Sequence, residues 1–396
     1  MLSVQFIVGA AFSIVPPLIP LVLPGLGVHG PGAVRTWAGT LVGVTPLAAA
    51  LMSPQWGRWV DRFDARLIIL VSCLVAAVCT ASMGFARNPW QLLTLRFTMG
   101  LFGGHVAAAL AIMSSAAPPD KLGWALGCLT TGQLSGTLFG PLIGGLIADA
   151  LASLHAPFLL AGASVLLVTG FVLLVPAGAK IEMEGHGNPE PKQSRRPLPA
   201  TVRHLIVTSL LVQCAIMVTQ PIISLHVRAL VGDRVHSTTL AGLGFSVVGL
   251  GGLIAAPLLG TLSDRAGAGR LLLCISLAAA ACVVPQAYAT TYSWFVAERF
   301  VAGLFLGSAI PIVNSLVARA TPADKRGHAF GVASGAAFLG AFLGPVSGGL
   351  LGARLGLTAV FQASAGLLVL TSTWVAITIW PAVTPTRRRS ATAVGR

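Results

Sequence analysis

Long hydrophobic runs alternate with short polar stretches along the whole chain. Runs of about 20 apolar residues are long enough to cross the hydrocarbon core of a bilayer as α-helices. The pattern predicts twelve transmembrane helices, at residues 5–23, 36–56, 67–86, 90–113, 124–147, 157–177, 203–226, 239–262, 270–288, 292–316, 327–349 and 358–380. We therefore expect an all-α integral membrane protein, with both termini on one side because twelve is an even number.

The longest polar stretch lies between the sixth and seventh apolar runs and is rich in charged residues, proline and glycine. Such a composition is typical of a flexible linker. We expect a six-helix bundle at 1–178, a cytoplasmic linker at 179–202, a second six-helix bundle at 203–381 and a basic cytoplasmic tail at 382–396.

The first apolar run is short, and Pro16, Pro17 and Pro20 interrupt it. No basic residue precedes it. We expect either that the natural chain begins several residues upstream or that the first helix lacks its inner turn. A cleaved signal peptide is the competing interpretation, but the charged segment that begins such peptides is missing.

The composition agrees with a membrane location, since 55% of the residues are hydrophobic and only 9% are charged. A soluble domain carries about 25% charged residues. The net charge of +14 does not indicate a nucleic-acid partner, because the basic residues are spread over short loops. With cytoplasmic termini, inner loops and the tail hold 18 of the 25 Lys and Arg residues, and outer loops hold five. This bias predicts that both termini are cytoplasmic.

The sequence contains no P-loop, no H-E-x-x-H, no C-x-x-C and no nucleophile elbow. We therefore expect a protein that is not an enzyme, holds no metal and does not use ATP directly. Its cysteines lie within apolar runs, where we interpret them as packing residues without a disulfide framework. They are Cys73, Cys79, Cys128, Cys214, Cys274 and Cys282.

Five glycines and one proline recur in the fifth and eleventh apolar runs at offsets of 204 residues. The two copies are Gly127, Gly136, Gly140, Pro141, Gly144 and Gly145, and Gly331, Gly340, Gly344, Pro345, Gly348 and Gly349. Small residues at every fourth position leave one helix face bare, so a neighbouring backbone can approach closely. The proline predicts a local bend. Taken alone, the strips are also typical of ordinary tight packing in a membrane bundle.

Two further patterns recur at an offset of 203 residues. Gly57-x-x-x-Asp61-Arg62, after the second run, matches Gly260-x-x-x-Asp264-Arg265, after the eighth. Arg96 in the fourth run and Arg299 in the tenth are each followed by glycines four and eight positions later. Duplicated bundles of this kind predict a substrate site between the two copies, near the middle of the membrane.

These motifs resemble those of the major facilitator superfamily over nearly the whole chain. The loop from Gly260 through Asp264, Arg265 and Gly267 to Arg270 resembles the signature G-x-L-x-D-R-x-G-x-x-[RK] of that family. The repeated glycine–proline pattern resembles the antiporter signature of proton-coupled exporters. The sequence is most similar to twelve-span bacterial multidrug exporters of the drug–proton antiporter group. The resemblance implies two pseudo-symmetric six-helix bundles in the major facilitator fold, with both loops acting in gating.

The first copy of the loop departs from the signature. Asp64 stands where the second glycine belongs, and Arg66 comes one position early. Because aspartate tolerates the left-handed backbone, we expect Asp64 to adopt the turn that glycine allows. The resemblance implies that Asp61 contacts the start of the eleventh span near Gly327, where the helix dipole favours an anion.

Glu298, Arg96 and Arg299 lie within spans and are the candidates for proton coupling. A charge at membrane depth is costly and usually faces a cavity or a partner. In the exporters that the sequence resembles, the arginine of the fourth span is implicated in proton transfer. The alternative for Arg96 is that it snorkels to the membrane surface. The alternative for Glu298 is pairing with an arginine at the headgroup level.

Five other polar residues within the spans are candidates for lining a substrate cavity. They are Gln133, Gln213, Gln220, His105 and Asn314. Gln133 and Gln213 fall near the middle of the membrane, where a substrate is expected. Each is also interpretable as a hydrogen-bond partner between helices.

The resemblance implies a monomeric secondary transporter in a bacterial inner membrane, which exports amphipathic or hydrophobic small molecules by alternating access. The proton gradient would drive it without a cofactor, and the two glycine–proline helices would pack against the opposite half and prevent leak. The scarcity of polar residues in the spans favours a hydrophobic cargo. The alternatives are a major facilitator transporter for a sugar or another polar metabolite, and a membrane scaffold or sensor without transport.

Overall fold

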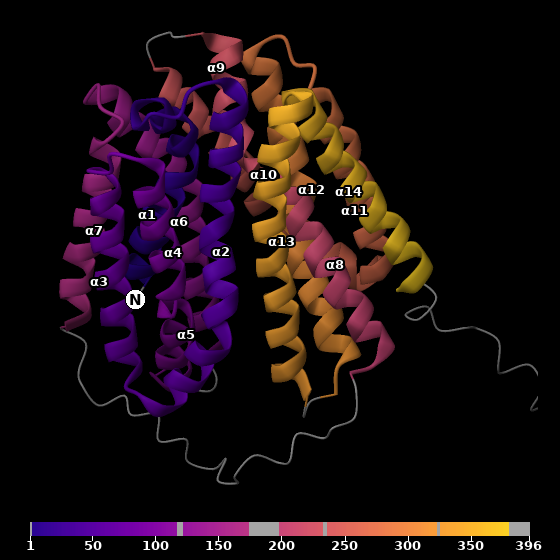
Figure 1. Ribbon diagram of the computed structural model, residues 1–396. Coiled ribbons are helices and arrows are strands. Elements are labelled where there is room, and N and C mark those ends of the chain that lie inside the picture. Colours follow the sequence, from indigo (N-terminus) through magenta and orange to yellow (C-terminus); the bar gives the residue numbers. More distant parts are fainter. Residues whose placement is uncertain (1, 117–121, 174–197, 233–235, 323–324, 380–396) are drawn as a thin grey trace, which may run out of the picture.

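The structure, a computed structural model, describes residues 2–116, 122–173, 198–232, 236–322 and 325–379. The first half of the molecule consists of α1 (Leu2–Val22), α2 (Pro31–Arg62), α3 (Ala65–Met83), α4 (Pro89–Leu101), α5 (His105–Ala116), α6 (Leu122–Ala150) and α7 (Ala156–Leu173). The second half consists of α8 (Ala200–Met217), α9 (Ile223–Val231), α10 (Ser237–Ala266), α11 (Ala268–Gln286), α12 (Tyr292–Ala320), α13 (Arg326–Leu355) and α14 (Leu357–Thr378). Figure 1 shows the two halves side by side, with their long helices running in the same general direction.

The described helices α1–α14 correspond to the twelve predicted spans, since the fourth and seventh spans are each divided into two α-helices. Nine helical segments in the described part of the chain are long and apolar enough to cross a membrane. The prediction of an all-α membrane protein is confirmed for these residues.

The break in the fourth span lies at Phe102–Gly104, between α4 and α5. Consecutive glycines weaken a helix, and the Trp56 indole fills the space beside Gly104 where a Cβ would lie. The Trp56 Nε1 donates a hydrogen bond of 2.7 Å to the carbonyl oxygen of Leu101. Carbonyls in the last turn of a helix lack helical partners, so the indole stabilises this break.

The break in the seventh span is a short 3-10 helix, η3 (Gln220–Ile222), between α8 and α9. Pro221 lies inside it and lacks the backbone N–H that a continuous α-helix needs. The first span ends in a similar way, in η1 (Leu23–Leu26), which contains Pro24.

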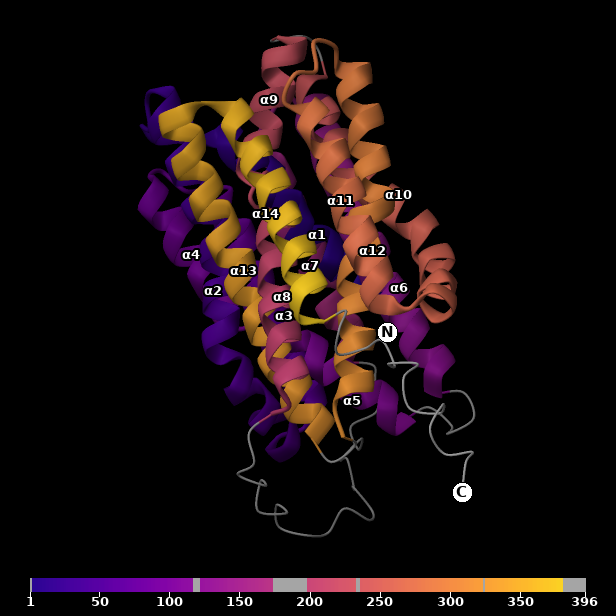
Figure 2. The ribbon, with the colours of Figure 1, turned by 90° about the vertical axis from the view of Figure 1, so that its right-hand side faces the viewer.

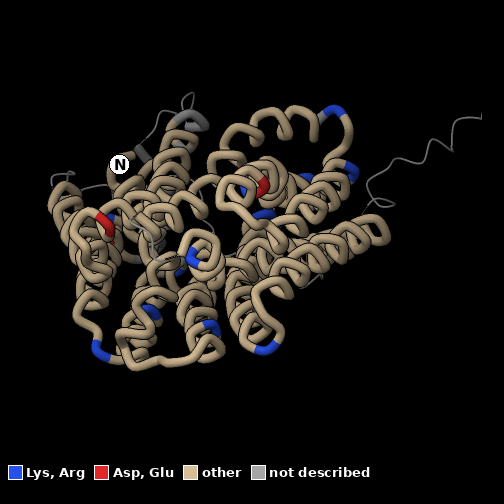
Figure 3. Tube along the Cα trace, turned by 90° about the horizontal axis from the view of Figure 1, so that it is seen from above, with Lys and Arg blue, Asp and Glu red and all other residues tan. Residues whose placement is uncertain are grey.

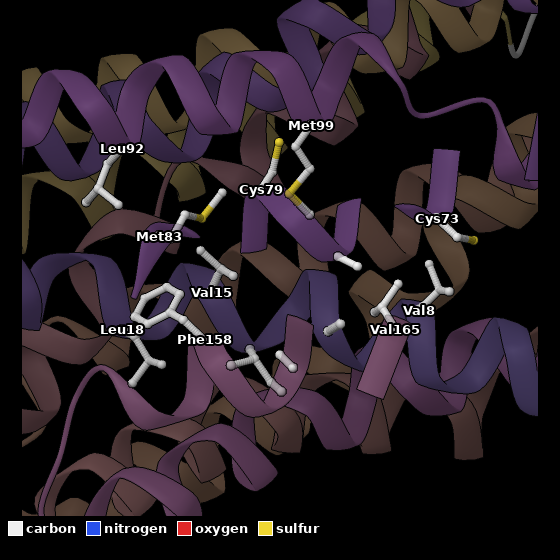
Figure 4. Packing of buried hydrophobic residues seen from close by; sticks show 14 of the residues in the cluster. Val8, Val15, Leu18, Cys73, Cys79, Met83, Leu92, Met99, Phe158 and Val165 are labelled. Atoms are coloured by element: carbon white, nitrogen blue, oxygen red, sulfur yellow. The ribbon is translucent and has the colours of Figure 1, made fainter. Parts of the chain in front are cut away.

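Each half buries an apolar core of its own. In the first half, Val15, Leu18 and Phe158 are at most 1% exposed, and Figure 4 shows them around Met83. The second half buries one cluster that includes Phe361 and another near the opposite helix ends. Tight packing of this kind holds membrane helices together where lipid supplies no hydrophobic driving force.

The two glycine–proline helices have equivalent neighbours in the two halves. The α6 helix packs against α1 in its own half and against α10 in the other half. The α13 helix packs against α8 in its own half and against α2 in the other, and Figure 2 shows it beside α8. Both helices therefore form part of the inter-half interface, by which we mean the contact between α1–α7 and α8–α14.

The two ends of the molecule differ in their connection to the predicted linker. The α7 helix ends at Leu173 and α8 begins at Ala200 at the same end, which is the lower one in Figure 1. We call it the linker end, and the opposite one the far end. Most of the predicted linker at 179–202 and all of the tail at 382–396 lie outside the described residues, so the domain boundaries stay a prediction.

Candidate functional site

The glycine strips face the helices of their own halves. On α6, a Cβ at Gly136 would meet the carbonyl of Phe6 in α1, and a Cβ at Gly144 would lie 2.9 Å from Ile14 Cγ2. Gly140 and Gly132 face α1 as well. The missing side chains therefore allow the α1 and α6 backbones to touch.

The equivalent strip of α13 faces α8. A Cβ at Gly344 would lie 2.7 Å from the Cys214 carbonyl oxygen, and one at Gly340 would meet the Leu210 carbonyl. A Cβ at Gly348 would meet the carbonyl of Val218, the C-cap residue of α8. The sequence predicts that the glycine helices pack against the opposite half. The helices do so, but the strips are directed to α1 and α8.

Contacts with the opposite half are made by the neighbouring face of each glycine helix. A Cβ at Gly145 would lie 2.5 Å from the Thr238 carbonyl oxygen of α10, and a Cβ at Gly349 would lie 2.5 Å from the Arg35 carbonyl oxygen of α2. A Cβ at Gly242 would meet the Pro141 carbonyl of the opposite half, and a Cβ at Gly39 would meet the Pro345 carbonyl in the same way. At these four glycines the two halves therefore meet backbone against backbone.

These inter-half contacts lie toward the far end. At the linker end, no described atom other than the neighbouring part of the same helix lies within 4 Å of the position that a Cβ would take on Gly127, Gly331 or Gly335. At the far end, Ser224 Oγ of α9 donates a hydrogen bond of 2.6 Å to the Pro17 carbonyl of α1. The described glycine helices thus meet the opposite half near the far end and face open space near the linker end.

The candidate arginines occupy equivalent positions. Arg96 is 5% exposed and donates from Nε to the Leu41 carbonyl of α2. Arg299 is 7% exposed and donates from Nε to the Gly244 carbonyl of α10 at 2.6 Å. The acceptors, like the arginines, are 203 residues apart. Both arginines are thus buried within their own half and bonded to a backbone carbonyl there.

Arg299 has a more polar environment than Arg96. Its Nη1 lies 3.5 Å from Gln286 Oε1, and its guanidinium carbon lies 5.7 Å from the centre of the Phe295 ring. Glu298 is half-buried, and its backbone carbonyl accepts a 3.5 Å contact from Gln286 Nε2. The structure thus brings Glu298 and Arg299 to one polar cluster, but through the Glu298 backbone.

The polar candidates for a substrate site are distributed over both halves. Half-buried Gln133 lies with its carbonyl against Gly9 of α1, and the buried His105 ring lies 5.4 Å from Phe12, also in α1. The other three candidates belong to the second half, where Gln213 is half-buried beside Gly340, Gln220 begins η3, and Asn314 is exposed on α12. Gln133 and His105 thus both contact α1. Gln213, Gln220 and Asn314 lie in the other half, away from these two residues.

One cavity of about 360 Å³ lies at the far end, between the two halves. It is bordered by the ends of α1 and α6 and by α9 and the start of α10, and its lining includes Asp149, Ser224 and Arg228. None of the five polar candidates lines it. Asp149 is not among the residues predicted from the sequence, which shows an acidic residue at the end of one span and Ser237-Thr238-Thr239 at the start of another but not that the two meet.

The two signature loops differ in backbone geometry. Gly267 has a φ of +89°, which favours glycine, and α11 begins directly after it. Asp64, the equivalent residue, has a φ of −58°, so the expected left-handed turn is wrong. Asp64 instead caps α3, because its Oδ1 accepts a hydrogen bond of 2.8 Å from the Arg66 backbone N–H.

The remaining loop residues are described only in part. Gly260, Arg265 and Arg270 are exposed, and Arg66 is half-buried. The surroundings of four other candidates lie outside what the structure describes, namely Gly57, Asp61, Arg62 and Asp264. The expected contact of Asp61 near Gly327 therefore stays a prediction.

Comparison with known proteins places the chain among membrane transporters. The family model described as Major Facilitator Superfamily matches residues 1–230 and 205–395. The chain is 34% identical over 374 residues to the multidrug resistance protein MdtG of Escherichia coli K12, covering 93% of this chain and 91% of that protein.

Solved structures agree on the fold. A bacterial homologue of the human lysosomal transporter Spinster, in an inward-facing and occupied conformation, superimposes with a TM-score of 0.76 at 15% identity, covering 98% of this chain and 96% of that one. The nucleoside transporter NupG superimposes with a TM-score of 0.73 at 12% identity, covering 96% and 99% of the two chains.

Proposed function

Because this chain belongs to the major facilitator superfamily, we propose that it exports amphipathic or hydrophobic small molecules from a bacterial cell in exchange for protons. The observation that carries the proposal is the 34% identity to a multidrug resistance protein over 93% of the chain. It is a multi-pass membrane protein and not an enzyme. We place it in the cell membrane as a monomer, with both termini in the cytoplasm.

The arrangement of the two halves supports transport by alternating access. The halves touch near the far end, and the described glycine helices face open space near the linker end. With a cytoplasmic linker, this is a state in which cargo enters from the cytoplasm. The substrate site would lie between the halves, as in other transporters built from parallel repeats.

The character of the spans supports a hydrophobic cargo. Few amide side chains within the spans are candidates for recognising a sugar or another polar metabolite, namely Gln133, Gln213, Gln220 and Asn314. A pocket for an apolar ligand needs only a few placed polar groups. The test is uptake into inside-out vesicles that contain the purified protein. The panel contains lipophilic cations, neutral drugs and sugars, and proton flux is recorded at the same time. Movement of sugars alone would favour the polar-metabolite alternative.

Glu298 is the proposed protonation site, because it is a half-buried carboxylate within a span and directly precedes the buried Arg299. We expect Glu298→Gln to bind cargo but to lose efflux driven by a proton gradient. Glu298→Asp keeps the acid and serves as the matched control. Unchanged proton-driven efflux in Glu298→Gln would remove Glu298 from the mechanism and leave the choice of cargo untouched.

A further inference from the structure

An acidic side chain crosses the inter-half interface at the far end. Asp149, near the end of α6, accepts two hydrogen bonds at Oδ2 from Thr239, one from the backbone N–H at 2.7 Å and one from Oγ1 at 2.6 Å. Thr239 is the third residue of α10. The first turn of a helix has unpaired N–H groups and the positive end of the dipole. The side chain of His236, the N-cap residue of α10, makes no hydrogen bond to these groups. Asp149 therefore caps a helix of the opposite half.

A basic side chain makes the corresponding contact in the other glycine helix pair. Arg35, in the first two turns of α2, donates from Nη1 to the Gly352 carbonyl at 2.7 Å. Gly352 lies in the last turn of α13, which ends at Leu355. Carbonyls in the last turn form the negative end of the helix dipole, which favours a cation. Arg35 therefore stabilises a helix end of the opposite half.

The two contacts lie one residue apart in the internal repeat of the chain. Arg35 is equivalent to Thr238, which precedes Thr239, and Asp149 is equivalent to Ala353, which follows Gly352. In one contact the charge is acidic and meets the start of a helix, and in the other it is basic and meets the end of one. Figure 3, which views the molecule from the far end, shows how few charged residues the described chain carries among its uncharged ones. Asp149 and Arg35 are two of these few charges, and each contacts a helix end of the opposite half.

We propose that Asp149 and Arg35 are gate residues that hold the far side of the transporter closed while its linker side is open. The inference rests on the proposed function, since a gate is needed only in a protein that alternates between two states. Opening of the far side separates α6 from α10 and α2 from α13, so both contacts must break. Hydrogen bonds with a charged partner are stronger than neutral ones and leave a larger penalty when they are lost.

The test measures how often the far side opens. Spin labels are attached at Arg87→Cys and Thr290→Cys, which are exposed, 203 residues apart, and located in far-end turns of the two halves. The six natural cysteines of the full-length protein are replaced beforehand, so that only the two introduced cysteines carry labels, and the protein is reconstituted in lipid. Distances between the labels give the ratio of far-open to far-closed molecules. Asp149→Ala and Arg35→Ala are each expected to raise this ratio about tenfold, as expected for the loss of a charged hydrogen bond.

Matched variants separate the gate from general effects. Arg354→Ala removes an exposed arginine from the same last turn of α13 and is expected to leave the ratio unchanged. Asp149→Asn keeps an acceptor oxygen but loses the charge, so its ratio is expected to lie between those of the natural protein and Asp149→Ala. It also provides a second test if Asp149→Ala does not fold.

The distance measurement does not depend on the cargo. A ratio that stays within twofold of the natural protein in both Asp149→Ala and Arg35→Ala would overturn the proposal. An equal shift in Arg354→Ala would overturn it too, because the effect of Arg35→Ala would then not depend on its contact with Gly352. If no cargo is transported by the natural protein but the ratios shift as expected, the proposed function fails and the gate assignment stands.

Discussion

Gly145→Ala tests whether close backbone contact between α6 and α10 controls the closed state. A Cβ added at this position would lie 2.5 Å from the Thr238 carbonyl oxygen and 2.8 Å from Thr239 Cα. Ordinary van der Waals contact begins at 3.4 Å, and both obstructing atoms belong to the backbone, so no side-chain rotation can relieve the overlap. The two helices must therefore move apart.

The expected size of this effect follows from the cost of overpacking. Adding a methyl group to a well-packed site typically costs about 1–3 kcal/mol. Since the overlap exists only when the halves touch at the far end, this cost falls on the far-closed state. Each 1.4 kcal/mol changes a population ratio about tenfold. We therefore expect the far-open population of Gly145→Ala to rise between roughly fivefold and a hundredfold, with a matching loss of coupled efflux.

The assay combines the far-end label distances with efflux in vesicles, and Gly331→Ala is the control. At Gly331 no described atom lies within 4 Å of the added Cβ, and alanine favours a helix more than glycine does. That variant is expected to fold at least as well as the natural protein and to keep its distance distribution. If Gly145→Ala shows the natural distance distribution and normal efflux, the reasoning from backbone contact is refuted.

Three further predictions concern stability and are measured by thermal or denaturant unfolding in detergent. Arg299→Met removes the donor to the Gly244 carbonyl and is expected to cost about 1.5–3 kcal/mol, because the bond has a charged partner; a loss below 0.5 kcal/mol would contradict this role. Trp56→Phe keeps most of the packing at Gly104 but loses the bond to Leu101, so a loss of about 1 kcal/mol is expected, and an unchanged midpoint would contradict it. Asp64→Ala removes the cap of α3 and is expected to cost about 0.5–2 kcal/mol, whereas Asp64→Asn keeps the acceptor and is expected to stay close to the natural stability.

The helical plan of the molecule was predictable because apolar runs and repeated motifs depend on local sequence. The runs gave the spans, and the offsets of 203 and 204 related the two halves. The division of the fourth span was missed, although Gly103 and Gly104 stand at the break. Two glycines permit a continuous helix as well as a break, and the Trp56 side chain from another helix decides between them.

The partners of the functional residues were less predictable. A glycine strip indicates that a backbone approaches, but it does not say which one, and the strips of α6 and α13 face their own halves. The Asp64 prediction failed because the side chain had a second option, as a helix cap, which satisfies a backbone N–H at a negative φ. Asp149 and Arg35 were not recognised as a pair, since their common feature is a contact across the interface.

The glycine strips that join α1 to α6 and α8 to α13 have a consequence for experiments on this protein. The α6 strip touches α1 over several turns within one half, from Gly132 to Gly144, whereas the glycine contacts between the halves described above lie toward the far end, where the two halves must separate. The α1–α6 pair is therefore expected to keep a constant spacing throughout the transport cycle. A pair of labels on these two helices would serve as an internal ruler, against which any change measured between the halves can be calibrated.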